Sequence, residues 1–84
     1  MSAKIIIYST SHCPYCVRAK ALLERKGMQF TEILIDKDDK LKDEMIEKAQ
    51  RYTVPQIFIN DSHVGGFDDL YALECSGKLD DFNV

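Results

Sequence analysis

Residues 5–8, Ile5-Ile6-Ile7-Tyr8, form an uninterrupted apolar run near the start of the chain. A run without polar alternation is typical of a strand that is covered on both faces of a sheet. It is also far too short for the core of a signal peptide or for a membrane span. We therefore predict a buried, central strand at residues 4–9, and we expect a cytoplasmic protein.

The next segments predict a helix and a second strand. Residues 30–35 end in three apolar side chains, and Gly27 is a natural end for a helix. Strand, helix and strand in this order predict a right-handed parallel crossover. The helix is expected at residues 14–26, with one apolar face formed by Cys16, Ala19, Leu22 and Leu23.

The second half of the chain predicts two more helices and a hairpin. Asp36 or Asp38 can cap a second helix, whose apolar residues at near-helical spacing are Leu41, Met45, Ala49 and Tyr52. A strand at residues 56–59, a turn at 60–61 and a strand at 63–64 predict a hairpin. A third helix is expected to open at Asp68 or Asp69 and to stop at Gly77. We expect one α/β domain over residues 1–84, a four-stranded mixed sheet flanked by three or more helices.

The segment Cys13-Pro14-Tyr15-Cys16 lies where the first strand gives way to the first helix. A Cys-x-x-Cys pair in this context is typical of a redox-active site. Pro14 suits the first helical position, so Cys13 lies near the N-cap, where unpaired backbone N–H groups and the helix dipole favour a thiolate. We predict that Cys13 is the exposed nucleophile, and that the more buried Cys16 attacks the resulting mixed disulfide. The spacing also permits a reversible disulfide between them.

The helix dipole alone is too weak to explain a stable thiolate. An exposed helix terminus contributes about 0.3–1 kcal/mol, whereas a hydrogen bond to a charged group contributes about 1.5–3 kcal/mol. We therefore predict that the backbone N–H groups of Tyr15 and Cys16 donate to the Cys13 sulfur.

Composition and cysteine spacing exclude several other classes. A net charge of −3 without clustered Lys or Arg argues against nucleic acid or an anionic membrane as the main partner. The alternative for the cysteine pair is simple burial or half of a zinc site. Structural zinc usually takes four ligands in paired spacings, and His12, His63 and Cys75 form no second pair, so no metal site is predicted. Cys75 is expected to be a core or surface thiol.

Three separated segments resemble the glutaredoxin family, in particular its small bacterial dithiol type. They are Cys13-Pro14-Tyr15-Cys16, residues 53–59 (Thr-Val-Pro-Gln-Ile-Phe-Ile) and residues 65–70 (Gly-Gly-Phe-Asp-Asp-Leu). The resemblance extends over nearly the whole chain. It implies a thioredoxin-like fold with sheet order 2-1-3-4 and a cis peptide bond between Val54 and Pro55.

The resemblance also implies a set of glutathione-binding residues: Tyr15, Thr53, Val54, Pro55, Gly66, Phe67, Asp68 and Asp69. In such a site the Val54 backbone pairs with the cysteinyl part of glutathione, as an added strand would. Backbone amides near Phe67 and Asp68 hold the γ-glutamyl carboxylate. Asp69 or Asp68 meets the γ-glutamyl ammonium, or simply caps the helix. Lys42 and Arg51 stay outside the predicted site, as solvated helix charges.

The chain departs from the family pattern near the nucleophile. Many relatives carry a basic residue where this chain has Thr10, and His12 can replace that charge only when it is protonated. Phe67 stands where a cysteine or a small residue is often found, which predicts a narrower groove.

The implied activity is glutathione-dependent reduction of protein disulfides and of protein-glutathione mixed disulfides. It implies roles in cell redox homeostasis and as electron donor to enzymes such as ribonucleotide reductase. Glutathione is expected as co-substrate without a permanently bound cofactor, and the protein as a monomer. Two alternatives stay open. One is a thioredoxin-like reductase recharged by a flavoprotein, which Gly65-Gly66 and Tyr15 disfavour; the other is an iron-sulfur cluster carrier with glutathione, which Pro14 disfavours.

Overall fold

A computed structural model describes residues 4–82, and its centre is a four-stranded sheet in the order β2-β1-β3-β4. β1 pairs in parallel with β2 and antiparallel with β3, which pairs antiparallel with β4. The mixed sheet, its strand order and the central place of the first strand are therefore confirmed. The strands are β1 (Ile5–Ser9), β2 (Thr31–Leu34), β3 (Gln56–Ile59) and β4 (Ser62–Gly65).

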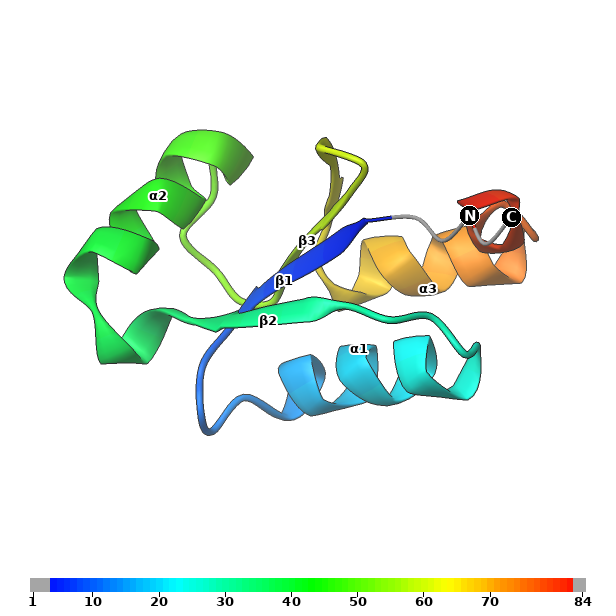
Figure 1. The fold of residues 1–84 in the computed structure, drawn as a ribbon, viewed down its shortest axis with the longest axis horizontal. Coiled ribbons are helices and arrows are strands. Elements are labelled where there is room, and N and C mark those ends of the chain that lie inside the picture. The colour runs from blue at the N-terminus through cyan, green and yellow to red at the C-terminus, as the bar shows by residue number, and fades with distance from the viewer. Residues whose placement is uncertain (1–3, 83–84) are drawn as a thin grey trace.

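Helices cover both faces of this sheet (Figure 1). α1 and α3 pack on one face, against Ile5, Ile7 and the matching residues of β3. α2 packs on the other face, against Tyr8 and Phe58. The helices are α1 (Pro14–Arg25), α2 (Asp39–Ala49) and α3 (Phe67–Cys75), with short 3-10 turns at Ile35–Lys37 and Leu79–Phe82. Among residues 4–82, no helix combines the length and apolar character needed to cross a bilayer.

α1 follows its sequence pattern closely. Its buried residues are the four predicted for the apolar face, Cys16, Ala19, Leu22 and Leu23. Pro14 occupies the first turn and Cys13 is the N-cap. Gly27, with φ +71°, follows the C-cap Lys26 in the left-handed conformation that glycine adopts at little cost. Both ends of the helix are thus fixed by residues visible in the sequence.

α2 ends earlier than its apolar spacing indicates. Asp38 is the capping residue, because its side chain accepts from the N–H of Lys40 at 2.9 Å. At the other end Gln50 adopts φ 59° and stops the helix after Ala49. Tyr52 therefore lies beyond the helix and is 78% exposed. The prediction that Tyr52 continues the apolar face was wrong, because the left-handed residue breaks the helical phase two positions before it.

The hairpin between β3 and β4 is confirmed. Asn60 and Asp61 both have positive φ, 52° and 69°, as the central residues of a type I′ turn do. This turn matches the right-handed twist of the two strands. β4 then leads directly to the start of α3.

α3 begins one or two residues earlier than predicted. Its N-cap is Gly66, and the helix starts at Phe67 rather than at Asp68 or Asp69. Asp69, three residues after the cap, accepts the N–H of Gly66 at 3.0 Å. The Asp69 carboxylate therefore accepts a free N–H group at the start of the helix from a position inside the first turn. The acidic residues belong to this first turn, and the N-cap is the glycine before them.

Gly65 is expected to tolerate no side chain. Its φ is +122°, and a Cβ atom there would overlap the carboxylate of Asp69. Gly65→Ala should lower the free energy of unfolding by about 1–3 kcal/mol, measured by urea denaturation. Gly27→Ala is the matched control, because Gly27 also has a positive φ but no atom within 4 Å of the added Cβ. Equal losses in the two variants would contradict a role for the overlap with Asp69.

Candidate active site

The Cys13 sulfur lies at the N-terminus of α1, in contact with two backbone groups. It accepts the N–H of Cys16 at 3.2 Å, and its thiol donates to the Val54 carbonyl at 3.7 Å. The predicted hydrogen bond from Cys16 is therefore confirmed, whereas the one from Tyr15 is not formed. Cys13 is partly exposed, so an incoming disulfide can reach it.

Cys16 is fully buried against the core. Burial raises the pKa of its thiol to about 12, and a hydrogen bond with Cys13 acts in the same direction. A backbone group of Thr10 and the charge of Lys20 oppose this rise in pKa. At neutral pH Cys16 is therefore a thiol. Cys13 is more accessible to solvent, and its sulfur accepts the backbone N–H of Cys16. This asymmetry matches the predicted order of attack.

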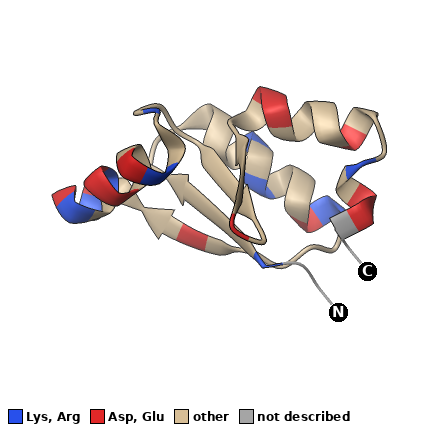
Figure 2. Ribbon diagram, turned by 90° about the horizontal axis from the view of Figure 1, so that it is seen from above, with Lys and Arg blue, Asp and Glu red and all other residues tan. Residues whose placement is uncertain are grey.

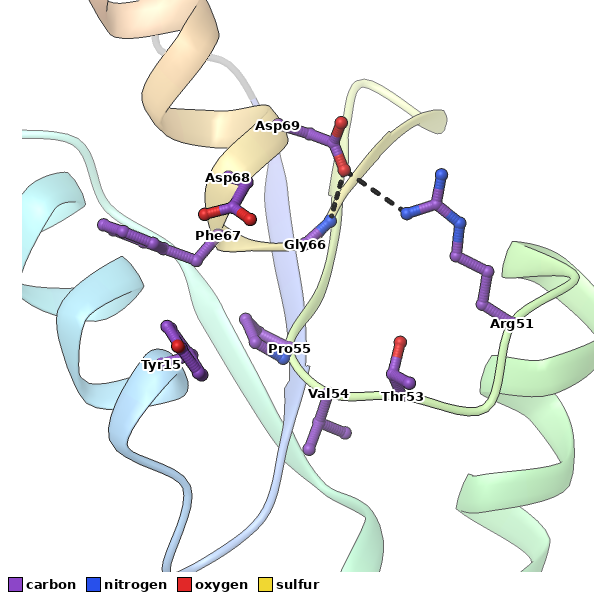
Figure 3. Close-up of a pocket in the computed structure, with 9 residues that line it drawn as sticks. All are labelled: Tyr15, Arg51, Thr53, Val54, Pro55, Gly66, Phe67, Asp68 and Asp69. Carbon is purple, nitrogen blue, oxygen red and sulfur yellow. Dashed lines mark hydrogen bonds and ion pairs between the residues drawn. The ribbon is translucent and has the colours of Figure 1, made fainter.

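A groove of about 210 Å³ adjoins the cysteine pair through Val54, and Figure 3 shows the residues that line it. Val54 connects the two, since its carbonyl contacts the Cys13 sulfur and the residue lines the groove. All eight residues predicted for glutathione binding line this groove, together with one that was not predicted, Arg51: Tyr15, Arg51, Thr53, Val54, Pro55, Gly66, Phe67, Asp68 and Asp69. The structure thus brings together residues from α1, from the loop before β3 and from the start of α3.

The loop before β3 is held by a buried polar side chain that the sequence reasoning missed. The Val54–Pro55 peptide bond is cis, as predicted. Gln56 is fully buried, donates to the Thr53 hydroxyl at 3.1 Å and lies 2.7 Å from Nε2 of His63. Burial, and then the charge of Arg51, lower the pKa of His63. In the sequence, a polar glutamine at the start of an otherwise apolar strand indicates a buried side chain that needs hydrogen-bond partners.

Arg51 and Asp69 form an ion pair at one side of the groove. Arg51 Nη1 lies 3.3 Å from Asp69 Oδ2, the oxygen that also accepts the Gly66 N–H (Figure 3). Both side chains are about half exposed, so the pair contributes little stability. Its effect is to place one cation and one anion at fixed positions beside the start of α3. Arg51 was left out because its approach to Asp69 depends on the turn that ends α2.

Aromatic side chains form the opposite wall. Phe67 lies beside Tyr15, with ring centroids 6.3 Å apart, and stacks on Tyr71 at 5.9 Å. The Arg18 guanidinium lies 5.5 Å from the centre of the Tyr15 ring. The large side chain of Phe67 thus fills space at the wall of the groove that a small residue would leave open.

The cysteine pair supplies the candidate reactive groups of this region. Cys75 is exposed at the end of α3, one of the two positions expected for it. Across the described part of the chain, residues 4–82, no three His, Cys, Asp or Glu side chains cluster so that they could hold a metal ion. What remains is a partly exposed thiol, a buried thiol one turn away and a charged groove beside them, an arrangement suited to thiol-disulfide exchange.

Comparison with known proteins agrees with this chemistry. The sequence model of the family "Glutaredoxin" matches residues 5–64. The chain is 57% identical to a glutaredoxin of Pseudomonas aeruginosa over 76 residues, which is 90% of each protein. It is 54% identical to glutaredoxin 3 of Escherichia coli K12 over 78 residues, 93% of this chain and 94% of that protein.

Two solved structures support the same assignment. The solution structure of glutaredoxin from Brucella melitensis is 55% identical, with a TM-score of 0.85 over 98% of this chain and 89% of that one. A buckwheat glutaredoxin-glutathione complex is 27% identical, with a TM-score of 0.88 over 96% of this chain and 76% of that one. The chain therefore belongs to the glutaredoxin family of thiol-disulfide oxidoreductases and has the thioredoxin-like fold of that family.

Proposed function

We propose that this protein uses glutathione to reduce protein disulfides and protein-glutathione mixed disulfides. The observation that carries the proposal is the contact between the Cys13 sulfur and Val54, a residue that lines a charged groove. A groove next to the nucleophile can hold the glutathione part of a mixed disulfide while the thiol attacks it. The similarity to a glutaredoxin whose structure is a glutathione complex supports this choice of co-substrate.

For a mixed disulfide, the Cys13 thiolate attacks the glutathione sulfur. The bond between glutathione and the protein breaks, and the protein leaves as a thiolate that takes up a proton. Cys13 is then joined to glutathione. A second glutathione thiolate attacks the glutathione sulfur of this adduct, releases Cys13 as the thiolate and forms glutathione disulfide.

For a protein disulfide, both cysteines take part. Cys13 attacks one sulfur of the substrate, and Cys16 then attacks Cys13 and releases the reduced substrate. Two glutathione molecules reduce the Cys13–Cys16 disulfide and leave as glutathione disulfide. Glutaredoxin potentials of about −200 to −230 mV allow a cytosolic glutathione pool to drive this cycle.

The groove offers groups for the cysteinyl and γ-glutamyl parts of glutathione. The Val54 backbone is proposed to pair with the cysteinyl residue, and the N–H groups of Phe67 and Asp68, in the first turn of α3, to bind the γ-glutamyl carboxylate. Asp69 is proposed to meet the γ-glutamyl ammonium. The remaining predicted residues form walls and floor: Tyr15, Thr53, Pro55 and Gly66.

Further expectations concern cellular context. We propose a cytoplasmic monomer that holds no permanent cofactor and donates electrons to disulfide-forming enzymes such as ribonucleotide reductase. Nucleic acid and membranes are not proposed as partners. Basic and acidic residues are mixed along the α2 ribbon rather than separated by sign, which supports this view (Figure 2).

The test is recharging by glutathione. The protein is given the mixed disulfide of glutathione with a small thiol, and NADPH consumption is followed with glutathione and glutathione reductase. Steady turnover is expected in this mixture. Turnover with a thioredoxin reductase instead would favour the thioredoxin-like alternative. Inactivity in both mixtures, with visible absorption after anaerobic iron and sulfide reconstitution, would favour a cluster carrier.

A further inference from the structure

A partly buried polar cluster joins β1, β2 and α1 and is not used by the chemistry above. Ser9, at the end of β1, is fully buried, and its hydroxyl donates to Glu32 Oε2 at 2.7 Å. Lys20 Nζ lies 2.6 Å from the same oxygen. The side chains of Lys20 and Glu32 are only 27% and 28% exposed. Two strands and one helix thus hold an ammonium group at a fixed position.

This cluster includes a residue that lies about one helical turn from Cys16 on α1. Lys20 follows Cys16 by four residues on α1, so the two side chains share one face of the helix. Ser9 directly precedes Thr10, whose backbone lowers the pKa of the Cys16 thiol. The fixed ammonium therefore belongs to the surroundings of the resolving thiol rather than to the groove that faces solvent.

Cys16 needs such a charge because its burial opposes the reactive form. Only a thiolate attacks a disulfide, and burial raises the pKa of Cys16 to about 12. The charge of Lys20 lowers this pKa. A long lysine side chain without a partner would instead extend its ammonium into water. The hydrogen bonds from Ser9 to Glu32 and from Lys20 to Glu32 prevent that movement.

We propose that Ser9 and Glu32 are positioning residues that hold the Lys20 ammonium beside Cys16, and that Lys20 thereby promotes the attack of Cys16 on the Cys13 mixed disulfide. In this step Cys16 gives its proton to water, its thiolate bonds to the Cys13 sulfur, and the substrate leaves as a thiolate and is protonated. The inference rests on the proposed resolving role of Cys16. It adds that the second exchange step, the attack by Cys16, depends on the Lys20 charge, whereas the first step, the attack by Cys13, does not.

The two exchange steps can be observed separately with dithiobis(nitrobenzoate). Cys13 attacks this aromatic disulfide and releases one coloured thionitrobenzoate, at a rate that depends on reagent concentration. Cys16 then attacks the Cys13 adduct and releases the second, at a rate independent of that concentration. Stopped-flow absorbance over a range of pH gives a profile for each phase, with no glutathione present.

Lys20→Met is expected to slow the second phase at neutral pH and to move its profile to higher pH, while the first phase is unchanged. One partly screened charge alters the thiolate fraction by about tenfold. A more basic thiolate is also a stronger nucleophile, which offsets part of the loss in thiolate fraction. The net slowing of the second phase is therefore about three- to fourfold. Lys20→Arg should restore the wild-type profile. Arg25→Met, which removes an exposed charge farther along the same helix, should leave both phases unchanged.

Glu32→Gln tests the positioning role directly. It keeps an acceptor for Ser9 but releases Lys20, so the second phase should again slow. An unchanged or faster second phase would show that Glu32 does not position Lys20. A second phase that is present but has the same pH profile in Lys20→Met as in wild type would overturn the inference while the proposed function stands. Absence of a second phase in wild type would instead refute the resolving role of Cys16 itself.

Discussion

Cys13→Ser is expected to lose disulfide reduction by roughly three orders of magnitude or more. A serine hydroxyl does not ionise near neutral pH, and it cannot form the sulfur-sulfur bond on which both exchange routes depend. The structure gives no other thiol that can replace it. Cys16 is fully buried, and Cys75 is at the far end of α3 from the groove. The measurement is glutathione-coupled turnover of a small mixed disulfide.

Cys16→Ser is the matched control, because it removes a thiol of the same motif. It should keep turnover of the glutathione mixed disulfide, which needs Cys13 alone, and lose most reduction of a protein disulfide such as insulin. Thermal unfolding of both variants should remain cooperative, since serine is nearly isosteric with cysteine. Activity retained by Cys13→Ser and lost by Cys16→Ser would reverse the assigned roles.

Much of the fold could be predicted because the decisive signals are local. The unbroken run at residues 5–8 is explained by helices that pack on both faces of β1. The four apolar positions of α1 are its buried positions. Positive φ angles at Asn60 and Asp61 correspond to residue types that tolerate this conformation. In each case a short stretch of sequence determines the structure by itself.

The errors arise where one residue or a distant contact overrides the local pattern. Gln50 adopts a left-handed conformation, which a glutamine in this position does not predict. The helix therefore ends before Tyr52, and the Tyr52 side chain is exposed. α3 starts at a glycine because the Asp69 carboxylate reaches back to it. Apolar spacing gives no information on either choice.

The candidate site was predictable in its members but not in its internal contacts. The resemblance to glutaredoxins identified eight of the nine residues that line the groove, all except Arg51, and the structure brings them together. The ion pair between Arg51 and Asp69 joins residues from two different elements, and it depends on the conformation of the turn after α2. Such contacts follow from tertiary packing, which the sequence of either element alone does not contain.

Asp69→Asn is expected to raise the KM for glutathione by about tenfold or more, with little change in kcat. The proposed ammonium contact is a charge-assisted hydrogen bond, worth about 1.5–3 kcal/mol, and 1.4 kcal/mol corresponds to a factor of ten. Asparagine keeps an oxygen that accepts the Gly66 N–H, so the start of α3 should survive. The substitution removes the charge that pairs with Arg51 and, in our proposal, with glutathione.

Asp68→Asn separates this effect from a general loss of negative charge. Asp68 lies in the same first turn and lines the same groove, but its carboxylate makes neither the Gly66 hydrogen bond nor the ion pair with Arg51. If Asp69 binds the ammonium, the KM for glutathione should rise in Asp69→Asn and change less than about threefold in Asp68→Asn. A rise only in Asp68→Asn would move the ammonium contact to Asp68. An unchanged KM in Asp69→Asn, at equal thermal stability, would leave Asp69 with the capping role alone, because the hydrogen bond to Gly66 needs an acceptor oxygen and not a charge.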